Sequence, residues 1–523
     1  MGVVAAGHRL TARAGAEILA RGGGAVDAVC AAALAGAVAE SPLTGPGAGG
    51  FLIARDPGGR TTLLDFFVAV PGLGPAGRRL DPGDLRSFTV PFGGADQEFH
   101  IGPASVGVPG LVAGVGEAVA RLGRLPLAEI VAPAVRIAGE GVVLTREAAY
   151  LHAILGEMLT ATPEAAAVYA PGGRLLGAGD RVRFPDLAGT LRHIGAAGPA
   201  TFRDGVLAAA LADHMAAAGG LVTREDLLRY EVVERMPLRV AYRGAELLTN
   251  PPPSSGGALI AAALHEMEAG PPPADEVGHY RAVARAGAAA NALRDEAFPD
   301  DLWEEDFMER LWARRAAAGR GGASPGPPEG RKPAGSTTHV SAVDADGGMA
   351  GLSSSNGSGS GVVVPGTGVL LNNMLGEEDL NPGGFGRIAP GRRMTSMMAP
   401  SLLLRDGEPV LVIGSAGSNR LRSAILQTLV AIVDGGMGAA DAVRRPRVHP
   451  EGRGVDVEGG VPGAAADALA ADGHELRRWG EMNLFFGGVS VAARGPGGPE
   501  GAGDPRRGGA AAAVTRSGEV IDI

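Results

Sequence analysis

The stretch Gly335-Ser336-Thr337-Thr338-His339-Val340-Ser341-Ala342-Val343-Asp344 contains the features that decide the fold of this chain. The segment before it, from about residue 316 to residue 335, has almost no apolar bulk. Such a composition predicts a flexible linker, because it cannot bury enough surface to become ordered. The residues that follow predict a β-hairpin, with strands at 338–343 and 349–354 around an Asp-Ala-Asp-Gly turn. A linker that runs directly into a strand beginning with threonine indicates a chain that is cut at this junction.

Thr337 becomes a useful nucleophile only at the start of a chain. A threonine hydroxyl needs a base beside it near neutral pH, and an N-terminal threonine supplies its own α-amine. That amine titrates near pH ~8, so part of it is neutral under ordinary conditions. Thr337 lacks this base while Ser336 is attached. We therefore expect self-cleavage between the two residues, which leaves a larger piece, residues 1–336, and a smaller one, residues 337–523.

The composition favours one large α/β body rather than several separate domains. The chain has 523 residues, 45% of them hydrophobic, and its charge, glycine and alanine content varies little apart from the linker. Its net charge is −10, without a basic stripe, so we expect no nucleic-acid partner. Short hairpins and flanking helices in both pieces predict stacked sheets with helices outside them.

The segment 25–38 surrounds the single cysteine, Cys30, and is rich in alanine and valine. It is too short to span a membrane, and one cysteine cannot form an intrachain disulfide. We interpret Cys30 as a buried structural thiol. The N-terminus lacks the pattern of a secretory signal, which predicts a cytoplasmic protein without membrane attachment, unless an export signal has been trimmed from the chain.

Hydrophobic periodicity and the positions of glycine and proline predict the other elements. Helices are expected at 10–21, 26–39, 110–122, 127–138, 206–218, 258–269 and 421–434. Strands are expected at 50–55, 61–65, 239–242, 246–248, 368–371, 401–405 and 409–413.

Short motifs along nearly the whole chain resemble those of the γ-glutamyltranspeptidase family of N-terminal-nucleophile hydrolases. They occur in the family's order and are Gly22–Ala28, Gly107–Gly110, Gly219–Leu227, Pro251–Gly257, Thr337–His339, Leu370–Asn373, Ser396–Met397, Gly414–Ser418 and Gly503–Arg507. The resemblance implies an α+β fold with four αββα layers and a precursor that is cut before Thr337. It also implies that Thr337 attacks an amide carbonyl and that the acyl-enzyme passes its acyl group to water or to an amine.

The resemblance also assigns roles around the nucleophile. Asn356 matches an asparagine that lines the family's pocket. This match places the hydroxyl that assists the nucleophile's amine at Ser354 or, one residue later, at Ser355. The family's oxyanion donors are two adjacent backbone N–H groups, which match Gly417 and Ser418.

Four further residues match the family's contacts to the substrate. Glu377 matches an acidic residue that binds the α-ammonium group, and Asn373 matches a pocket residue nearby. Thr395 and Ser396 match a pair of hydroxyls that bind the carboxylate. These matches predict a site for a γ-glutamyl group.

The largest departure from the family is Phe67, which stands where the family has an arginine that binds the substrate carboxylate. Loss of such a charge-assisted contact removes about 1.5–3 kcal/mol, or roughly ten- to a hundredfold in affinity. A phenyl ring favours an apolar or aromatic group instead. Arg392 or Arg393 is the alternative source of a guanidinium group in the pocket.

Three functions are compatible with these residues. The first is an autoprocessed amidohydrolase or acyltransferase that acts on small γ-glutamyl amides such as glutathione. The second, favoured by Phe67 and Met374, keeps Thr337 but has the altered acyl pocket of a glutaryl- or cephalosporin-acylase-like enzyme. The third is an uncleaved, non-catalytic homologue. No cofactor or metal is expected, because the ten histidines lack metal-binding spacing and His339 is expected to support the hairpin.

Overall fold

The computed structural model describes residues 1–523 except 93–94, 296, 319–336 and 496. Most of the predicted linker therefore lies outside the described residues. Its first three positions, 316–318, are not linker but the end of helix α14 (Phe307–Ala318). Alanine favours continuation of a helix, which explains the difference.

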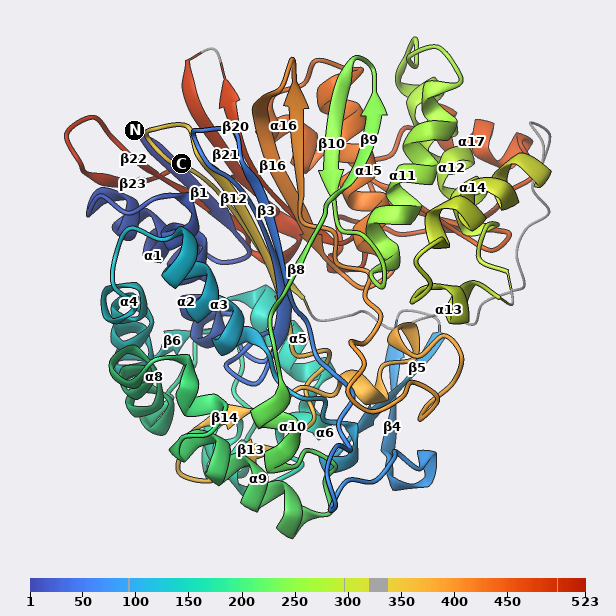
Figure 1. Cartoon of the computed structure of the whole chain (residues 1–523). Helices are drawn as coiled ribbons and strands as arrows, with labels where there is room; N and C mark the ends of the chain where they lie inside the picture. Colours follow the sequence, from blue (N-terminus) through green and yellow to red (C-terminus); the bar gives the residue numbers. More distant parts are fainter. Residues whose placement is uncertain (93–94, 296, 319–336, 496) are drawn as a thin grey trace.

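Two sheets lie face to face at the centre, and helices cover the outer face of each (Figure 1). The first sheet has eight strands, in the spatial order β23 (Val520–Asp522), β22 (Ala510–Val514), β1 (Gly2–Ala6), β11 (Thr338–Val343), β12 (Met349–Ser355), β2 (Gly49–Arg55), β3 (Thr61–Phe66) and β8 (Val233–Arg235). The second has six, in the order β21 (Gly498–Gly503), β20 (Gly488–Gly495), β16 (Glu408–Ala416), β15 (Ser401–Arg405), β10 (Ala245–Thr249) and β9 (Leu238–Tyr242). The predicted α+β fold with four αββα layers is confirmed.

Three hydrophobic cores fill the spaces between the four layers. Ile53 of the first sheet and Val412 of the second contribute to the core between the sheets. Their chain neighbours turn the other way, because successive side chains of a strand point to opposite faces. Leu52 thus belongs to the core under the first helix layer, and Leu411 belongs to the core under the second.

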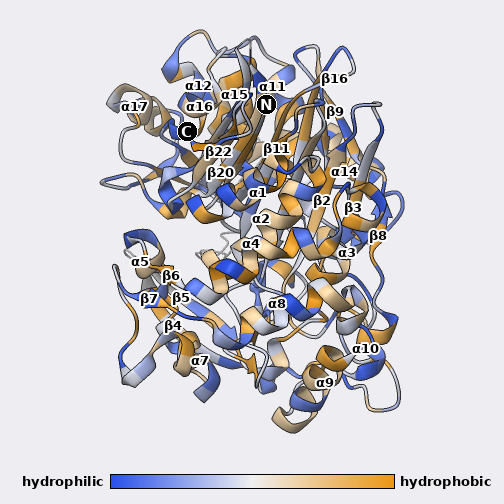
Figure 2. Ribbon diagram, turned by 90° about the vertical axis from the view of Figure 1, so that its left-hand side faces the viewer, coloured by the Kyte–Doolittle hydropathy of each residue, from blue (hydrophilic) through white to orange (hydrophobic). Residues whose placement is uncertain are grey.

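Figure 2 shows the first helix layer facing the viewer. Helices α1 (Arg9–Ala20) and α2 (Ala25–Ala39) pack on the strands of the first sheet, and α4 (Leu127–Glu140) packs outside them against α2. All fifteen residues of α2 are buried, because its small side chains allow close packing against neighbours on every side. Cys30 lies within this helix as a free, buried cysteine, and burial raises the pKa of its thiol. The interpretation of Cys30 as a buried thiol is confirmed.

The remaining elements complete the outer layers and extend the body below the sheets (Figure 1). The second helix layer and its surroundings contain α11 (Ser255–Glu268), α12 (Glu276–Asn291), α13 (Phe298–Asp301), α15 (Arg420–Val433), α16 (Ala439–Arg444), α17 (Gly463–Ala471), β17 (Val448–Glu451), β18 (Gly454–Val457) and β19 (Glu475–Arg478). The other elements are α3 (Leu111–Leu122), α5 (Arg146–Ile154), α6 (Gly156–Leu159), α7 (Pro163–Tyr169), α8 (Pro185–Ala197), α9 (Val206–Ala218), α10 (Arg224–Arg229), β4 (Arg86–Phe92), β5 (Ala95–Ile101), β6 (Val142–Val143), β7 (Arg181–Val182), β13 (Val363–Val364) and β14 (Val369–Leu370). In the described part of the chain, no helix has the length and apolarity needed to cross a membrane.

The predicted pieces 1–336 and 337–523 interleave in both sheets. Strands β11 and β12 come from the second piece and lie between β1 and β2 of the first. Strands β9 and β10 come from the first piece and extend a sheet built mainly by the second. Neither piece builds either of the two large sheets alone, so a cut before Thr337 would leave two chains that share both of them.

Candidate active site

Thr337 stands immediately before β11 and is buried, with 6% of its surface exposed. It lines a pocket with twelve other residues, which come from distant parts of the chain. Five of the predicted site residues meet there, namely Phe67, Thr337, Glu377, Ser396 and Ser418. The other lining residues are Ser355, Gly357, Met374, Asp379, Leu380, Met397, Met398 and Leu421. We refer to this space as the Thr337 pocket.

The hairpin register places Ser355, rather than Ser354, beside Thr337, the predicted nucleophile. Thr338 pairs with Ser354 in the β11–β12 ladder, so Ser355 lies opposite Thr337. The hydroxyl of Ser354 is instead 2.8 Å from the hydroxyl of Thr44 and does not line the pocket. Of the two candidates for the assisting hydroxyl, the geometry favours Ser355.

Glu377 brings a carboxyl group to the pocket. Its Oε1 accepts hydrogen bonds from the backbone N–H of Ser358 at 2.8 Å and from the Ser358 hydroxyl at 2.9 Å. Burial raises the pKa of Glu377, and the hydrogen bonds from Ser358 and Asn373 oppose this effect. Asn373 does not line the pocket, and its amide donates to the Ser358 hydroxyl at 2.6 Å. A cationic group bound in the pocket would favour the ionised form of Glu377.

A second carboxylate in the pocket, Asp379, was not among the predicted site residues. It accepts hydrogen bonds from the hydroxyl of Ser418 and, at 3.0 Å, from the side-chain amide of Asn419. Its only signal in the sequence is its place at the end of the acidic run that begins at Glu377. The contact ties this acidic segment to the predicted oxyanion turn.

Gly417 and Ser418 form that turn, between β16 and α15, with φ angles of 118° and 51°. A side chain at Gly417 would come within 2.9 Å of the Cα of Gly487, so glycine is required there for space as well as for conformation. Ser418 adopts the left-handed region, where its hydrogen bond to Asp379 helps to hold it. Successive backbone N–H groups in such a turn form a concave anion site, as the oxyanion role requires.

The aromatic ring of Phe67 occupies the pocket wall and stacks on Phe51, with 5.5 Å between the ring centroids. Neither alternative arginine lines the pocket. Arg393 pairs with Asp65 at 3.2 Å and donates to the carbonyl of Phe67 at 2.7 Å, on the other side of this segment. Arg392 lies over the ring of Trp303 instead. The suggestion that one of them replaces the missing guanidinium is therefore not supported by the geometry.

The sequence profile described as Gamma-glutamyltranspeptidase matches residues 11–514. The chain belongs to the γ-glutamyltranspeptidase family. It is 34% identical over 534 residues to the acylase ACY 1 proenzyme of Pseudomonas sp. (strain SE83), which covers 95% of this chain and 90% of that protein. It is 30% identical over 486 residues to the glutathione hydrolase proenzyme of Escherichia coli (strain K12), which covers 86% of this chain and 80% of that protein. The crystal structure of cephalosporin acylase from Bacillus halodurans is also similar, with a TM-score of 0.83, 28% identity and coverage of 98% and 95% of the two chains.

In this member of the γ-glutamyltranspeptidase family, the predicted hydroxyl pair is divided. Ser396 lines the Thr337 pocket, and its hydroxyl accepts a hydrogen bond from the backbone N–H of Met398 at 3.0 Å. Thr395 does not line the pocket, because its hydroxyl donates to the carbonyl of Leu380 at 2.8 Å. The pocket therefore retains one hydroxyl of the pair.

Asn356 lies behind the pocket wall formed by its neighbours Ser355 and Gly357. Its backbone N–H donates to the carbonyl of Leu43 at 2.9 Å, and its side-chain amide donates to the carbonyl of Pro42 at 3.3 Å. These contacts hold the loop after β12 in place. Asn356 therefore supports the wall without reaching the pocket.

His339 supports the hairpin, as expected from the sequence. Its two ring nitrogens are hydrogen-bonded to the hydroxyls of Ser353 and Ser341, at 2.8 and 2.9 Å. Burial lowers the pKa of His339 to about 3, so the ring is neutral. Within the described ranges, no group of three or more histidine, cysteine, aspartate or glutamate residues is arranged to hold a metal ion.

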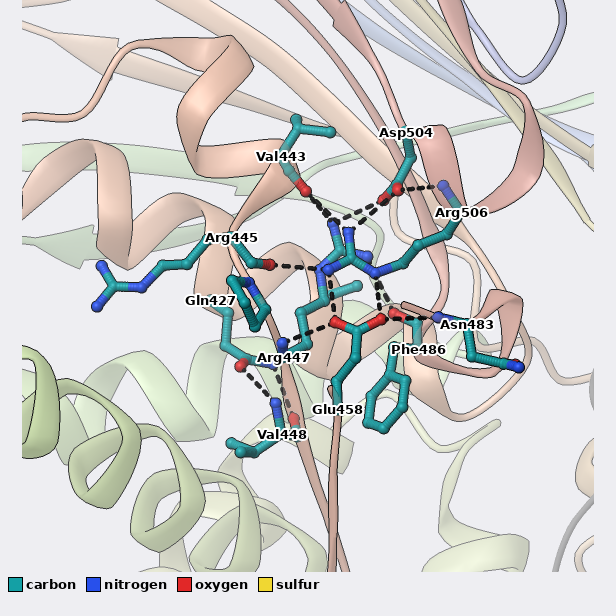
Figure 3. A network of polar contacts seen from close by, with 12 residues as sticks. Gln427, Val443, Arg445, Arg447, Val448, Glu458, Asn483, Phe486, Asp504 and Arg506 are labelled. Atoms are coloured by element: carbon teal, nitrogen blue, oxygen red, sulfur yellow. Dashed lines mark hydrogen bonds and ion pairs between the residues drawn. The ribbon is translucent and has the colours of Figure 1, made fainter. Parts of the chain in front are cut away.

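A buried network of charged residues lies behind the Gly417–Ser418 turn and consists of Arg447, Glu458, Asp504 and Arg506 (Figure 3). We refer to it as the Arg506 network. Its two shortest ion pairs measure 2.5 and 2.7 Å, and no side chain in it is more than 2% exposed. Arg447 also donates to the carbonyl of Phe486 at 3.0 Å, and Gly417 packs against the next residue, Gly487. The network therefore fixes the surface on which the turn rests.

Proposed function

We propose that this protein is a self-processed N-terminal-threonine amide hydrolase or acyltransferase. The observation that carries the proposal is the position of Thr337, which lies at the junction with the linker and in a pocket that is also lined by Ser355 and by Ser418 of the Gly417–Ser418 turn. Membership of the γ-glutamyltranspeptidase family supports the same reaction class.

The residues suggest one role each in this reaction. After the cut, the α-amine of Thr337 accepts the proton of its own hydroxyl as the oxygen attacks the acyl carbonyl carbon. Backbone N–H groups of the Gly417–Ser418 turn stabilise the negative charge on the carbonyl oxygen. The departing amine takes the proton and leaves an ester on Thr337, which water or a second amine then cleaves. Ser355, opposite the nucleophile, orients the α-amine.

The charges in the pocket narrow the class of acyl group. Glu377 and Asp379 are its acidic members, and none of its described lining residues is lysine, arginine or histidine. A free carboxylate on the acyl group would therefore meet the carboxyl group of Glu377 without a cation among the described lining residues, whereas an ammonium group would be attracted to Glu377. Phe67 and Met374 favour an apolar chain. We propose acyl amides whose acyl group is uncharged or bears an ammonium group.

Hydrolysis or transfer of γ-glutamyl amides is the second candidate function. Glu377 favours it, because a γ-glutamyl group carries an α-ammonium as well as an α-carboxylate. Phe67 weakens it, since the carboxylate would meet only the Ser396 hydroxyl. A glutaryl group has the carboxylate without the ammonium, so it fits the charges least well.

Four anilides with five-carbon acyl chains separate these possibilities: pentanoyl, 5-aminopentanoyl, γ-glutamyl and glutaryl. We expect kcat/KM to be highest for the pentanoyl or 5-aminopentanoyl compound, lower for γ-glutamyl and lowest for glutaryl. A preference for glutaryl would contradict the proposed acyl class. Absence of hydrolysis of any amide by cleaved protein would contradict the proposed reaction.

A further inference from the structure

The hydroxyl of Thr338 makes a buried contact on the side of β11 away from the Thr337 pocket. Side chains alternate along a strand, so the residue after the nucleophile points to the opposite face. There its hydroxyl donates to Oε2 of Glu40 at 2.5 Å. The other carboxylate oxygen, Oε1, accepts a hydrogen bond from the hydroxyl of Thr11 at 2.7 Å. Glu40 thus joins the end of α2 to α1 and to the first residue of β11.

The surroundings of Glu40 are built closely around this contact. A side chain at Gly7 would come within 2.3 Å of Oε2 of Glu40 and within 3.2 Å of the Thr338 hydroxyl. Burial raises the pKa of Glu40, while the hydrogen bonds from Thr338 and Thr11 and the charge of Arg507 oppose this effect. Moving a carboxyl group from water into the protein interior costs free energy unless hydrogen bonds compensate for the lost water. Burial of Glu40 therefore indicates that its hydrogen bonds to Thr338 and Thr11 have a specific purpose.

The Glu40 contact also lies beside the nucleophile itself. A second small cavity, at the start of β11, is lined by Glu40, Thr338 and Thr337 and also by residues of the second sheet such as Ser490. Thr337 also lines the Thr337 pocket, so it stands between the two spaces. The backbone on its C-terminal side is fixed by the β11–β12 ladder and by the Thr338 side chain.

We propose that Glu40 is a positioning residue for the cut before Thr337. By holding the Thr338 hydroxyl, Glu40 fixes the second residue beyond the scissile bond and, through it, the direction of the Thr337 hydroxyl. This inference rests on the proposed self-processing, and it adds Glu40 to the residues that are proposed to act in that reaction. Glu40 itself does not touch the reacting atoms in this account.

The reaction that Glu40 would assist is an N-to-O acyl shift followed by hydrolysis. The Thr337 oxygen adds to the carbonyl carbon of Ser336, the C–N bond to Thr337 breaks, and the hydroxyl proton passes to the departing nitrogen. Water then cleaves the resulting ester, which restores the Thr337 hydroxyl and leaves a carboxyl group on Ser336. Such an intramolecular attack depends strongly on geometry, and a displacement of about 1 Å can slow it roughly a hundredfold.

Removal of either hydroxyl that binds Glu40 provides a matched test. Thr338→Val and Thr11→Val each remove one hydrogen bond from the same carboxylate, but only Thr338 adjoins the nucleophile. Full-length chains would be made by cell-free synthesis, and the fraction cleaved would be followed on denaturing gels together with the melting temperature. We expect Thr338→Val to slow cleavage by at least about tenfold and Thr11→Val to change it by less than about threefold.

Conservative variants separate positioning from folding. Thr338→Ser keeps the hydroxyl and should restore cleavage to within about threefold of the wild-type rate, and Glu40→Ala should slow cleavage as Thr338→Val does. In the cleaved enzyme, Thr338→Val should lower kcat for the pentanoyl anilide and leave KM unchanged, because the contact directs the nucleophile without binding substrate.

Two results would overturn the inference. Wild-type rates of cleavage in Thr338→Val would show that the contact is not needed, and equal slowing in Thr11→Val would show that it acts only through folding. An unmodified chain that is never cut would instead contradict the proposed function, and the inference would fall with it. The wild-type lane therefore distinguishes the two failures.

Discussion

The Arg506 network and the Thr337 pocket both contain two carboxyl groups in a buried setting, but their partners differ. In the network, Glu458 and Asp504 form ion pairs with two arginines (Figure 3). In the pocket, Glu377 accepts hydrogen bonds from the backbone N–H and hydroxyl of Ser358, and none of the described lining residues is cationic. Asp379 accepts hydrogen bonds from Ser418 and Asn419 and also interacts electrostatically with the buried Arg420. A carboxylate that is paired with arginines inside the fold stabilises packing, whereas a carboxyl group that faces a cavity, such as Glu377, is available to select a ligand.

The largest expected effect comes from the nucleophile in the pocket. Thr337→Ala removes the hydroxyl required for the cut and for acyl transfer, so the chain should remain one band on a denaturing gel. Activity toward every anilide should fall by at least about 10⁴-fold. Residual activity near the wild-type level would place the chemistry elsewhere.

Arg506→Met tests the structural role of the network. The variant leaves two buried carboxylates with one arginine, so we expect the free energy of unfolding to fall by about 3–5 kcal/mol. Arg405→Met, at an exposed arginine of β15, is the control and should change it by less than about 0.5 kcal/mol. Denaturant titration of the two variants would measure the difference.

The folded fraction of Arg506→Met should keep the wild-type order of preference among the four anilides. The network contacts the backbone behind the oxyanion turn and does not line the pocket. A changed order of preference would show that the two regions do not have the separate roles assigned to them.

Phe67→Arg adds a cation to the pocket and should reverse its charge preference. We expect kcat/KM for the glutaryl anilide, relative to the pentanoyl anilide, to rise by roughly ten- to a hundredfold. Phe67→Leu keeps the wall apolar and should leave this ratio unchanged. An unchanged ratio in Phe67→Arg would mean that the acyl chain does not lie against this wall.

Glu377→Gln removes one of the two acidic groups from the pocket. We expect kcat/KM for the 5-aminopentanoyl anilide to fall about tenfold, with little change for the pentanoyl compound. Glu378→Gln is the matched control, because this neighbour is exposed and does not line the pocket. Equal losses in both variants would argue against a specific ammonium site at Glu377.

The smallest expected effect is on the pH dependence of stability. Burial raises the pKa of Glu377 above 4.5, so the folded state binds this proton more tightly than the unfolded state does. Protonation of Glu377 therefore adds to the free energy of unfolding at low pH, and this stabilisation is lost as the pH rises through the folded-state pKa of Glu377. The melting temperature of the wild type relative to Glu377→Gln should fall between pH ~4.5 and neutral pH, measured without ligand. A rise over that range would contradict the assigned shift.

Much of the central architecture could be predicted from the sequence. All the predicted helices and strands occur, with ends that differ by at most three residues. Their apolar patterns, glycine stops and turns were locally consistent with the final fold. The prediction did not identify β1 or β22. Ala510–Val514 has the composition of a helix and becomes a strand by pairing with β1 on one side and β23 on the other.

The site was less predictable, because it depends on register and on contacts between distant segments. The run Ser353-Ser354-Ser355 allowed either of two serines to face the nucleophile, and only the pairing with Thr338 distinguishes them. From the sequence alone, Asp379 could equally be a solvent-exposed member of an acidic run, and only its hydrogen bond from Ser418 shows that it belongs to the pocket. Likewise, the sequence allowed Arg393 to reach the pocket, and only the structure shows that it forms an ion pair with Asp65 instead.

The most direct test of the account is the mass of each polypeptide in purified, active wild-type protein. We predict two chains that remain associated, the smaller of which begins at Thr337 and ends at Ile523. A fully active preparation that consists of one uncut chain would contradict the account, since Thr337 would then have no free amine to activate its hydroxyl.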